Sequence, residues 1–360
     1  MGELVQLSRG VALGVALVLG LSLLSGAQKK RKKKGGEEEE VTQTLPLLKD
    51  PPLAVTADTE RISFRVSPLS AKGLLSPQVR EALKSLLQSS HGASIVKLRA
   101  FVAGTGDVRR VQTIVSEVFT ERKLPLPTLT VVQVGGLPLE GAQVVIESTG
   151  VEKKAVNPQG LAFLSGQPGE SASDSVEHLG RTLSGIGITG SRVLRATCFL
   201  SALDVAGKTR TVLAGAFPNA AVNLVQMQRV PVRPPCECEA VAALERPVEG
   251  TVRFGDGYTL VASPRIALSG LQMAFHEEES DVRLAFERLG RTLDTQGTGF
   301  KEVVAASVYV LDGGAAAAFR KVRPDFLPSA NPPALSLLPF ESLPSVDASL
   351  GMDVVAAVRK

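Results

Sequence analysis

The chain has no tryptophan, two tyrosines, three cysteines and three histidines among its 360 residues. Aromatic residues make up 4% of the chain, so it offers almost no rings on which nucleic-acid bases could stack. Beyond residue 40 the acidic and basic residues nearly balance, which leaves no excess of positive charge for a phosphate backbone. These two features exclude nucleic acid as an expected partner. The apolar fraction of 44% indicates a globular protein whose core is built mainly from Val, Leu, Ala and Phe.

The three cysteines are too few for a disulfide framework. Cys236 and Cys238 lie two residues apart on one expected strand, where parallel side chains give poor geometry for a mutual disulfide. Cys198, on another expected strand of the same region, could bond to one of them after export, but three buried thiols are the favoured expectation. Further ligands are lacking, so no metal site is predicted.

No catalytic or cofactor motif stands out. The histidines fall at unrelated places and pair visibly with no nucleophile: His91, His178 and His276. Residues 185–190 match GxGxxG in letters, but they follow an expected helix and precede an expected strand. A dinucleotide fingerprint needs the opposite order, so this segment is predicted to be a helix-ending loop, and no cofactor is expected.

The N-terminal segment has the composition of a targeting sequence. Residues 11–27, VALGVALVLGLSLLSGA, are apolar or small and end in residues typical of a signal-peptidase site. The run is shorter than the roughly 20 residues of a membrane-spanning helix. We therefore expect residues 1–27 to be a signal peptide of a periplasmic or secreted protein. Six basic residues at 29–34 favour the alternative, a membrane anchor through residues 11–27.

Residues 28–52, including KKRKKKGGEEEE, are predicted to form a charged flexible linker, through which the N-terminal region could contact a membrane surface.

An internal repeat accounts for most of the remaining chain. The sequence LGRTL occurs at 179–183 and again at 289–293, and the two surrounding segments align without a gap. Residues 80–104 form a fainter third copy with the same order of helix, glycine-containing loop and strand. The repeat predicts three modules of about 100 residues, a common domain size, at 53–152, 153–249 and 250–360.

Each module is expected to be an α+β unit. Apolar residues at helical spacing predict helices over 76–87, 108–119 and 282–293. β-branched runs predict an opening strand in each copy at 61–66, 160–166 and 265–270, and two closing strands. This order predicts a mixed sheet with two helices on one face.

The ordered motifs resemble the RidA/YjgF family, the reactive-intermediate imine/enamine deaminases. The second copy has GLAFLSGQPG (160–169), a central strand VLRATCFLSALD (193–204), QRVP (228–231) and CECEAVAAL (236–244). The resemblance implies three RidA-like (chorismate-mutase-like) modules. Because the family is described as homotrimeric, with ligand clefts between subunits, it also implies a monomeric, single-chain pseudo-trimer and a small-molecule ligand.

One family residue is absent from every copy. The resemblance implies an Arg eight residues before each Leu-Pro-like strand end, where it binds a substrate carboxylate. The corresponding residues here are aliphatic: Leu129, Val222 and Leu335. Because a guanidinium binds a carboxylate through two charge-assisted hydrogen bonds, its loss predicts a non-catalytic binding or scaffold protein. The alternative is a diverged deaminase or hydrolase that acts on a small non-amino-acid substrate at the clefts between modules.

The resemblance also implies a set of candidate ligand-binding residues at strand ends, on the Glu-x-Glu-Ala strand and near an early Tyr. They are Ser165, Gly166, Ser269, Gly270, Glu147, Glu237, Glu239 and Tyr258. In the alternative enzyme, a glutamate would act as acid/base. The first acid of Glu-x-Glu-Ala is assigned to Glu237 and Asp353, and the second to Glu147 and Glu239. Loop caps, solvated strand carboxylates and a half-buried aromatic residue are the structural alternatives.

Overall fold

The computed structural model describes residues 47–104 and 106–358. The expected signal peptide or anchor at 1–27 and most of the expected linker at 28–52 lie outside these residues. From Leu47 onward the chain forms one compact unit. In this described part, the structure contains no helix of sufficient length and apolarity to span a membrane.

The unit contains three sheets, each of which is built largely from one third of the chain. In spatial order, the first sheet has β2 (Ile62–Val66), β5 (Val144–Val151), β3 (Ser94–Ala103) and β4 (Thr128–Val134). The second has β10 (Val252–Gly255), β11 (Tyr258–Val261), β6 (Leu161–Gly169), β9 (Cys236–Ala243), β7 (Val193–Leu200) and β8 (Ala221–Gln226). The third has β1 (Ala54–Asp58), β12 (Arg265–Ser269), β16 (Ala348–Ala357), β14 (Val303–Val310) and β15 (Ala334–Pro339), with β13 (Gln272–Phe275) also paired to β16.

The same strand pairings recur in all three sheets. The central strands β3, β7 and β14 each pair in parallel with the following strand and antiparallel with the last strand of the same third. Each last strand also pairs antiparallel with the opening strand of its third. The α+β fold with mixed sheets is therefore confirmed, and its element order is repeated three times.

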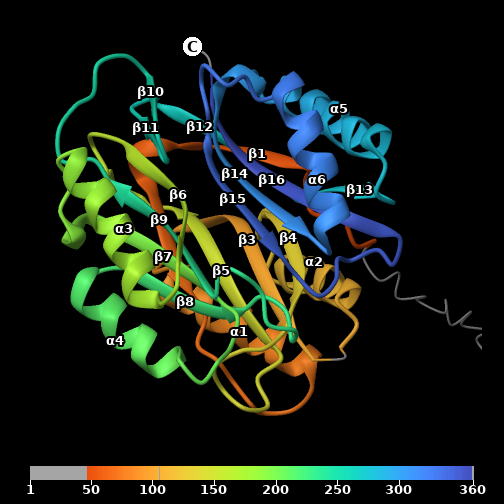
Figure 1. Cartoon of the computed structure of the whole chain (residues 1–360). Helices are drawn as coiled ribbons and strands as arrows, with labels where there is room; N and C mark the ends of the chain where they lie inside the picture. Colours follow the sequence, from red (N-terminus) through yellow and green to blue (C-terminus); the bar gives the residue numbers. More distant parts are fainter. Residues whose placement is uncertain (1–46, 105, 359–360) are drawn as a thin grey trace, which may run out of the picture. The chain divides into compact units, whose positions relative to one another are not determined.

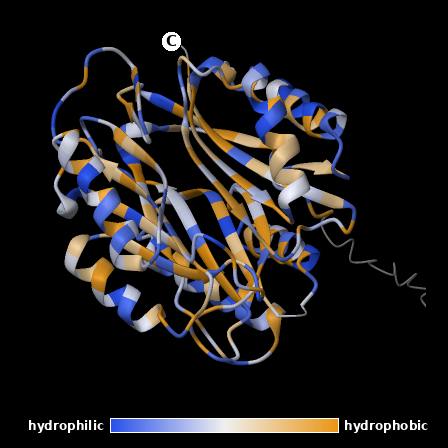
Figure 2. Cartoon of the chain, viewed as in Figure 1, coloured by the Kyte–Doolittle hydropathy of each residue, from blue (hydrophilic) through white to orange (hydrophobic). Residues whose placement is uncertain are grey.

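Two helices cover one face of each sheet, and Figure 1 shows the three pairs outside the strands. They are α1 (Leu75–Ser89) and α2 (Arg109–Glu121), α3 (Ala172–Gly185) and α4 (Ala206–Ala216), and α5 (Glu279–Thr295) and α6 (Gly313–Val322). Short 3₁₀ turns lie at η1 (Thr59–Arg61), η2 (Gly190–Arg192), η3 (Phe300–Glu302) and η4 (Arg323–Asp325). Each helix pair buries its apolar stripe against its own sheet and makes a separate core. Figure 2 shows these helices with mixed hydropathy and the strands between them largely hydrophobic.

Two segments pair across the module boundaries that the sequence analysis draws. Strand β1, near the start of the described chain, joins the third sheet through β12, with Ala54 opposite Ser269. The β10–β11 hairpin, assigned by sequence to the third module, extends the second sheet, with Tyr258 opposite Leu164. Short strands therefore link the sheets in addition to side-chain packing.

A β-bulge recurs near the start of each central strand. The register shifts between Ile95 and Lys97 in β3, between Val193 and Arg195 in β7, and between Val303 and Ala305 in β14. A bulge inserts one residue and re-aims the side chains beside it. The bulges therefore give the three central strands the same register relative to their neighbours, which defines equivalent positions in the three thirds.

The helix-free faces of the sheets pack on one another in layers. One layer is aromatic: the Phe340 ring centroid lies 6.3 Å from that of Phe101, 5.9 Å from that of Phe199 and 5.4 Å from that of Tyr309. Phe101, Phe199 and Tyr309 occupy equivalent positions on β3, β7 and β14. A second apolar layer contains residues of all three sheets, including Ile62 from the first. Charged side chains lie between the two layers.

Candidate functional site

Three buried carboxylates occupy equivalent positions on the last strands of the three sheets. Glu147 lies opposite Arg99, Glu239 opposite Thr197, and Asp353 opposite Ser307. All three carboxylate residues are buried, with exposed fractions of 3–4%. Together with the cations Lys97, Arg99 and Arg195, they form what we call the central ring.

Each carboxylate accepts a hydrogen bond from an equivalent side chain of a different sheet. Asn223 Nδ2 donates to Glu147 Oε1 at 2.8 Å, and Ser336 Oγ donates to Glu239 Oε2 at 2.6 Å. Thr130 Oγ1 donates to Asp353 Oδ2 at 2.9 Å. The donors therefore run from the second sheet to the first, from the third to the second, and from the first to the third. This cycle of contacts ties each sheet to both of the others.

Three cations neutralise the three carboxylates. The Arg99 guanidinium lies 2.7 Å from both Glu147 and Glu239, and it thus bridges two sheets. Arg195 lies 3.2 Å from Glu239, and Lys97 forms an ion pair with Asp353. Buried ionised groups are tolerated only when they are paired and hydrogen-bonded, which is the case here.

The ring sets the protonation of its members. Burial alone would raise the pKa of Glu147, but Arg99 and Arg195 lower it below its ordinary value. Burial lowers the pKa of Lys97, and the attraction of Asp353 offsets this effect only in part. Glu147 is therefore ionised at neutral pH and has no tendency to act as a general acid.

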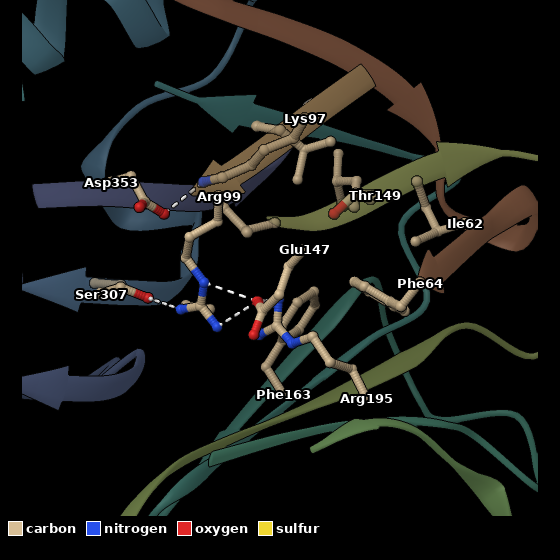
Figure 3. A pocket seen from close by; sticks show the side chains of 15 residues that line it. Ile62, Phe64, Lys97, Arg99, Glu147, Thr149, Phe163, Arg195, Ser307 and Asp353 are labelled. Carbon is tan, nitrogen blue, oxygen red and sulfur yellow. Dashed lines mark hydrogen bonds and ion pairs between the residues drawn. The ribbon is translucent and has the colours of Figure 1, made fainter. Parts of the chain in front are cut away.

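A small cavity adjoins the ring. Figure 3 shows Lys97, Arg99, Glu147, Arg195 and Asp353 around it, together with apolar side chains from the neighbouring layer. Its volume is about 50 Å³. This volume is far below the roughly 300–1,000 Å³ of ordinary small-molecule sites. The candidates Glu147 and Glu239 therefore belong to a structural joint between sheets.

The third copy is aligned differently from the sequence-based assignment. Asp353 was assigned to the first acid of Glu-x-Glu-Ala, but its register opposite Ser307 makes it equivalent to the second acid, Glu239. The assignment from sequence was displaced by two residues in the third sheet, because the pairing of β16 with β14 determines the equivalence. The first-acid position, opposite the aromatic layer, holds Val145, Glu237 and Gly351 in the three sheets.

Three of the predicted site residues meet where the second and third sheets adjoin. The Leu335 backbone N–H donates to Ser165 Oγ at 3.0 Å, and the Gly166 N–H donates to Ser336 Oγ at 3.1 Å. Glu237 lies directly against Gly166, because a Cβ atom on that glycine would be 1.8 Å from Glu237 Oε1. A side chain at residue 166 would therefore displace the Glu237 carboxylate.

Glu237 differs from the ring carboxylates in having no paired cation. Burial, aided by the nearby charge of Glu239, raises the pKa of Glu237 to about 7. The group is half-buried, and no ion pair of the described residues includes it. It is the one predicted site acid whose pKa is suited to proton transfer near neutral pH.

The equivalent positions in the first and third sheets of the described chain hold no acid. Between the first and second sheets, Val145 and Val222 line a cavity of about 330 Å³, together with Ser67 and Arg210. Between the third and first sheets, a Cβ atom on Gly351 would lie 2.8 Å from Leu271 Cδ1. The leucine side chain therefore covers the space where an acid would project.

The three aliphatic residues at which the resemblance implies an Arg lie in or against the cores beneath the helices. Leu129 is buried in the core under α1 and α2, while Val222 and Leu335 are partly buried against the helix-side cores of their own sheets. Val145 and Val222 line the same cavity between the first and second sheets, and the Leu335 N–H donates to Ser165, the neighbour of Gly166. Leu271, which lies against Gly351, donates its N–H to the Leu129 carbonyl.

The other predicted residues lie elsewhere. Ser269 is fully buried, and its hydroxyl accepts a hydrogen bond from the Val354 N–H at 2.8 Å, while Gly270 donates its N–H to the Leu53 carbonyl. Tyr258 is half-buried on β11 and lines a surface hollow beside the end of α3. The eight predicted ligand residues therefore do not form one site.

The expectation of three free thiols was wrong. Cys198 is bonded to Cys238, its partner across β7 and β9, and Cys236 alone is a thiol. The sequence analysis had kept this pairing open, and the two cysteines of the same strand are indeed not bonded to each other.

Sequence reasoning missed the cations of the central ring. Lys97 and Arg99 alternate with apolar residues on β3, and Arg195 lies on the equivalent strand β7. A signal was present, because charged residues spaced by two in a strand share one face and cannot lie in an apolar core without partners.

Comparison with known proteins supports the family resemblance for the last third of the chain. Residues 256–358 match the family model described as endoribonuclease L-PSP. No curated protein matches the chain.

Solved structures that resemble the chain include a YjgF-family protein from Mycobacterium tuberculosis, at 17% identity and a TM-score of 0.24, covering 26% of this chain and 79% of that one. A YjgF-family protein from Neisseria meningitidis has 14% identity and a TM-score of 0.25, with 32% and 91% coverage. A Rid-family protein of unknown function from Yersinia pestis has 18% identity and a TM-score of 0.25, with 28% and 84% coverage.

Proposed function

We propose that the chain is a single-chain counterpart of a RidA-like trimer that binds small molecules, or serves as a scaffold, without catalysis. The threefold element order and the cycle of hydrogen bonds around the central ring support the three-module arrangement. The match of residues 256–358 supports the family of the third module. Export remains part of the proposal, motivated by the composition of residues 11–27.

The absence of an acid–arginine pair from the three clefts carries the proposal. The cleft positions hold Val145, Glu237 and Gly351, and the positions at which the resemblance implies an Arg hold Leu129, Val222 and Leu335. A carboxylate-bearing imine needs a guanidinium for its carboxylate, and each lost charge-assisted hydrogen bond weakens binding by about 1.5–3 kcal/mol. Loss of both bonds therefore removes most of the affinity for such a substrate.

The cleft between the first and second sheets supports a binding role. Its volume of about 330 Å³ lies in the range of small-molecule sites, and its lining is mostly aliphatic and proline. Arg210 is the one charged residue of this lining, and it makes no hydrogen bond or ion pair with the described residues. This combination suits a small molecule with an apolar body.

An imine-hydrolysis assay on the full-length protein tests the proposal. Unstable imines of several amino acids would be generated in the cuvette, with an active RidA-family enzyme as the positive control. The expected rate equals that of buffer alone at every protein concentration. Turnover that increases with protein concentration would contradict a non-catalytic role.

Glu237 favours a second candidate function, a diverged hydrolase. Its pKa of about 7 and its position beside Ser165 and Gly166 are compatible with general acid/base chemistry. A panel of neutral imines and esters would be compared between the wild-type protein and the Glu237→Gln variant. Hydrolysis that is lost in the variant would favour the enzyme over the binding protein.

A further inference from the structure

All three cysteines of the chain meet at one point of the second sheet. Cys198 lies opposite Cys238 across β7 and β9, and Cys236 lies two residues from Cys238 on the same face of β9. The residues are 0–3% exposed and belong to the apolar core under α3 and α4. The three cysteines belong neither to the cleft between the first and second sheets nor to the central ring.

The three sulfurs are near enough to one another to share one ion after reduction. The Sγ atoms of Cys236 and Cys238 are 3.8 Å apart, and the three sulfurs lie within 4.8 Å of one another. An ion bound by three sulfurs at about 2.3 Å each needs the sulfurs roughly 4 Å apart. The sulfurs of Cys198 and Cys238 are bonded to each other, so they must separate once this bond is opened before they can surround an ion.

We infer that the reduced form of this cluster binds one soft monovalent cation of the copper(I) type through Cys198, Cys236 and Cys238. Thiolates are soft ligands, and they select copper(I) over harder cations. Structural zinc sites need four ligands, and within the described residues the group offers only three. The surrounding core excludes water, which protects copper(I) from oxidation.

The conversion between the two forms balances as a two-electron reduction. An external dithiol gives two electrons to the Cys198–Cys238 bond and is itself oxidised to a disulfide, while the two released sulfurs become thiols. Copper(I) then replaces protons on the cysteines, and these protons go to the solvent. The oxidised protein, with one remaining thiol, has no site.

Copper(I) titration of the full-length protein tests this inference. The protein would be reduced, freed of reductant without oxygen, and titrated with copper(I) against a coloured chelator, while sulfur-to-copper absorption is followed in the ultraviolet. We expect one equivalent bound per chain in the reduced form and none in the oxidised form. Binding of less than half an equivalent to the reduced protein would overturn the inference.

The Cys236→Ser variant is the matched control because it keeps the Cys198–Cys238 bond and changes a single atom of the cluster. We expect at least a tenfold loss of copper(I) affinity in its reduced form, with unchanged thermal unfolding of its oxidised form. Unchanged affinity would place the copper elsewhere and refute the site. Preference for zinc over copper(I) at one equivalent would refute the proposed cation.

Discussion

Two positions on strands β5, β9 and β16 differ in how similar their residues are from sheet to sheet. The ring position holds Glu147, Glu239 and Asp353, an acid each time. Two residues earlier on the same strands, the cleft position holds a valine, a glutamate and a glycine. Both positions face away from the helices, so burial in the sheet alone does not explain the difference.

The interactions made by the side chains at the two positions explain this difference. A ring carboxylate is bonded to cations and donors from other sheets, so its removal leaves several buried polar groups without partners. A residue at the cleft position has no such set of buried charged partners: Val145, Glu237 and Gly351 are each accommodated by local packing. Within the described residues, the ring position therefore holds an acid in all three sheets, whereas the cleft position holds a different kind of residue in each.

The largest expected effect comes from Arg99, which pairs with two carboxylates of different sheets. Arg99→Met would leave Glu147 and Glu239 with less compensation in a buried site. We expect a loss of about 3–5 kcal/mol in the free energy of unfolding, measured by urea denaturation. The control is Arg181→Ala, which breaks an ion pair whose side chains are 63% and 67% exposed and should cost less than about 1 kcal/mol. Equal losses in the two variants would show that the ring is not a joint.

A double-mutant cycle on Lys97 and Asp353 tests whether this buried ion pair of the central ring is energetically coupled. Lys97→Met alone should cost about 3 kcal/mol, because it leaves the Asp353 carboxylate buried and unpaired. The pair Lys97→Met and Asp353→Leu should cost less than the sum of the two single changes, since neither charge then remains. Strict additivity of the three unfolding free energies would contradict a coupled ion pair.

The sequence predicted the repeat, the helices and the sheet class because these depend on local periodicity. It could not predict that Asp353 aligns with Glu239, because the pairing of β16 with β14 determines this equivalence and the residues around Asp353 lack the Glu-x-Glu-Ala pattern. It also missed the exchange of β1 and of the β10–β11 hairpin between sheets, since edge pairing depends on how the modules pack. The motif identified Glu237 as a candidate. The difference between its surroundings and those of Glu239 depends on how the sheets pack together.

The contribution of Glu237, at the cleft position, to the free energy of unfolding should depend on pH. The pKa of Glu237 in the folded protein, about 7, lies above its ordinary value, so the folded state holds a proton that the unfolded state releases. Its stabilising effect is complete at low pH and is lost as the pH rises through 7. The Glu237→Gln variant should therefore exceed the wild-type stability by roughly 2 kcal/mol at pH 8 and match it below about pH 4.5. Urea unfolding at a series of pH values measures this difference, and a constant gap would contradict it.

The smallest effect is expected at the edge of the open cleft. Arg210 is exposed and has no partner among the described residues, so Arg210→Met should change the free energy of unfolding by less than about 0.5 kcal/mol. Any apolar anion found to bind the protein should bind the variant more weakly. A large loss of stability in this variant would mean that the cleft, like the ring, holds the modules together.

The most direct test compares two identical substitutions two residues apart on β9. Glu239→Gln and Glu237→Gln each remove one negative charge from the same face of the same strand. At pH 8 the account predicts that Glu239→Gln loses about 3 kcal/mol of unfolding free energy, because Arg99 and Arg195 lose a shared carboxylate, while Glu237→Gln gains stability. Equal losses from the two substitutions would contradict the separation of a structural ring from a diverged cleft.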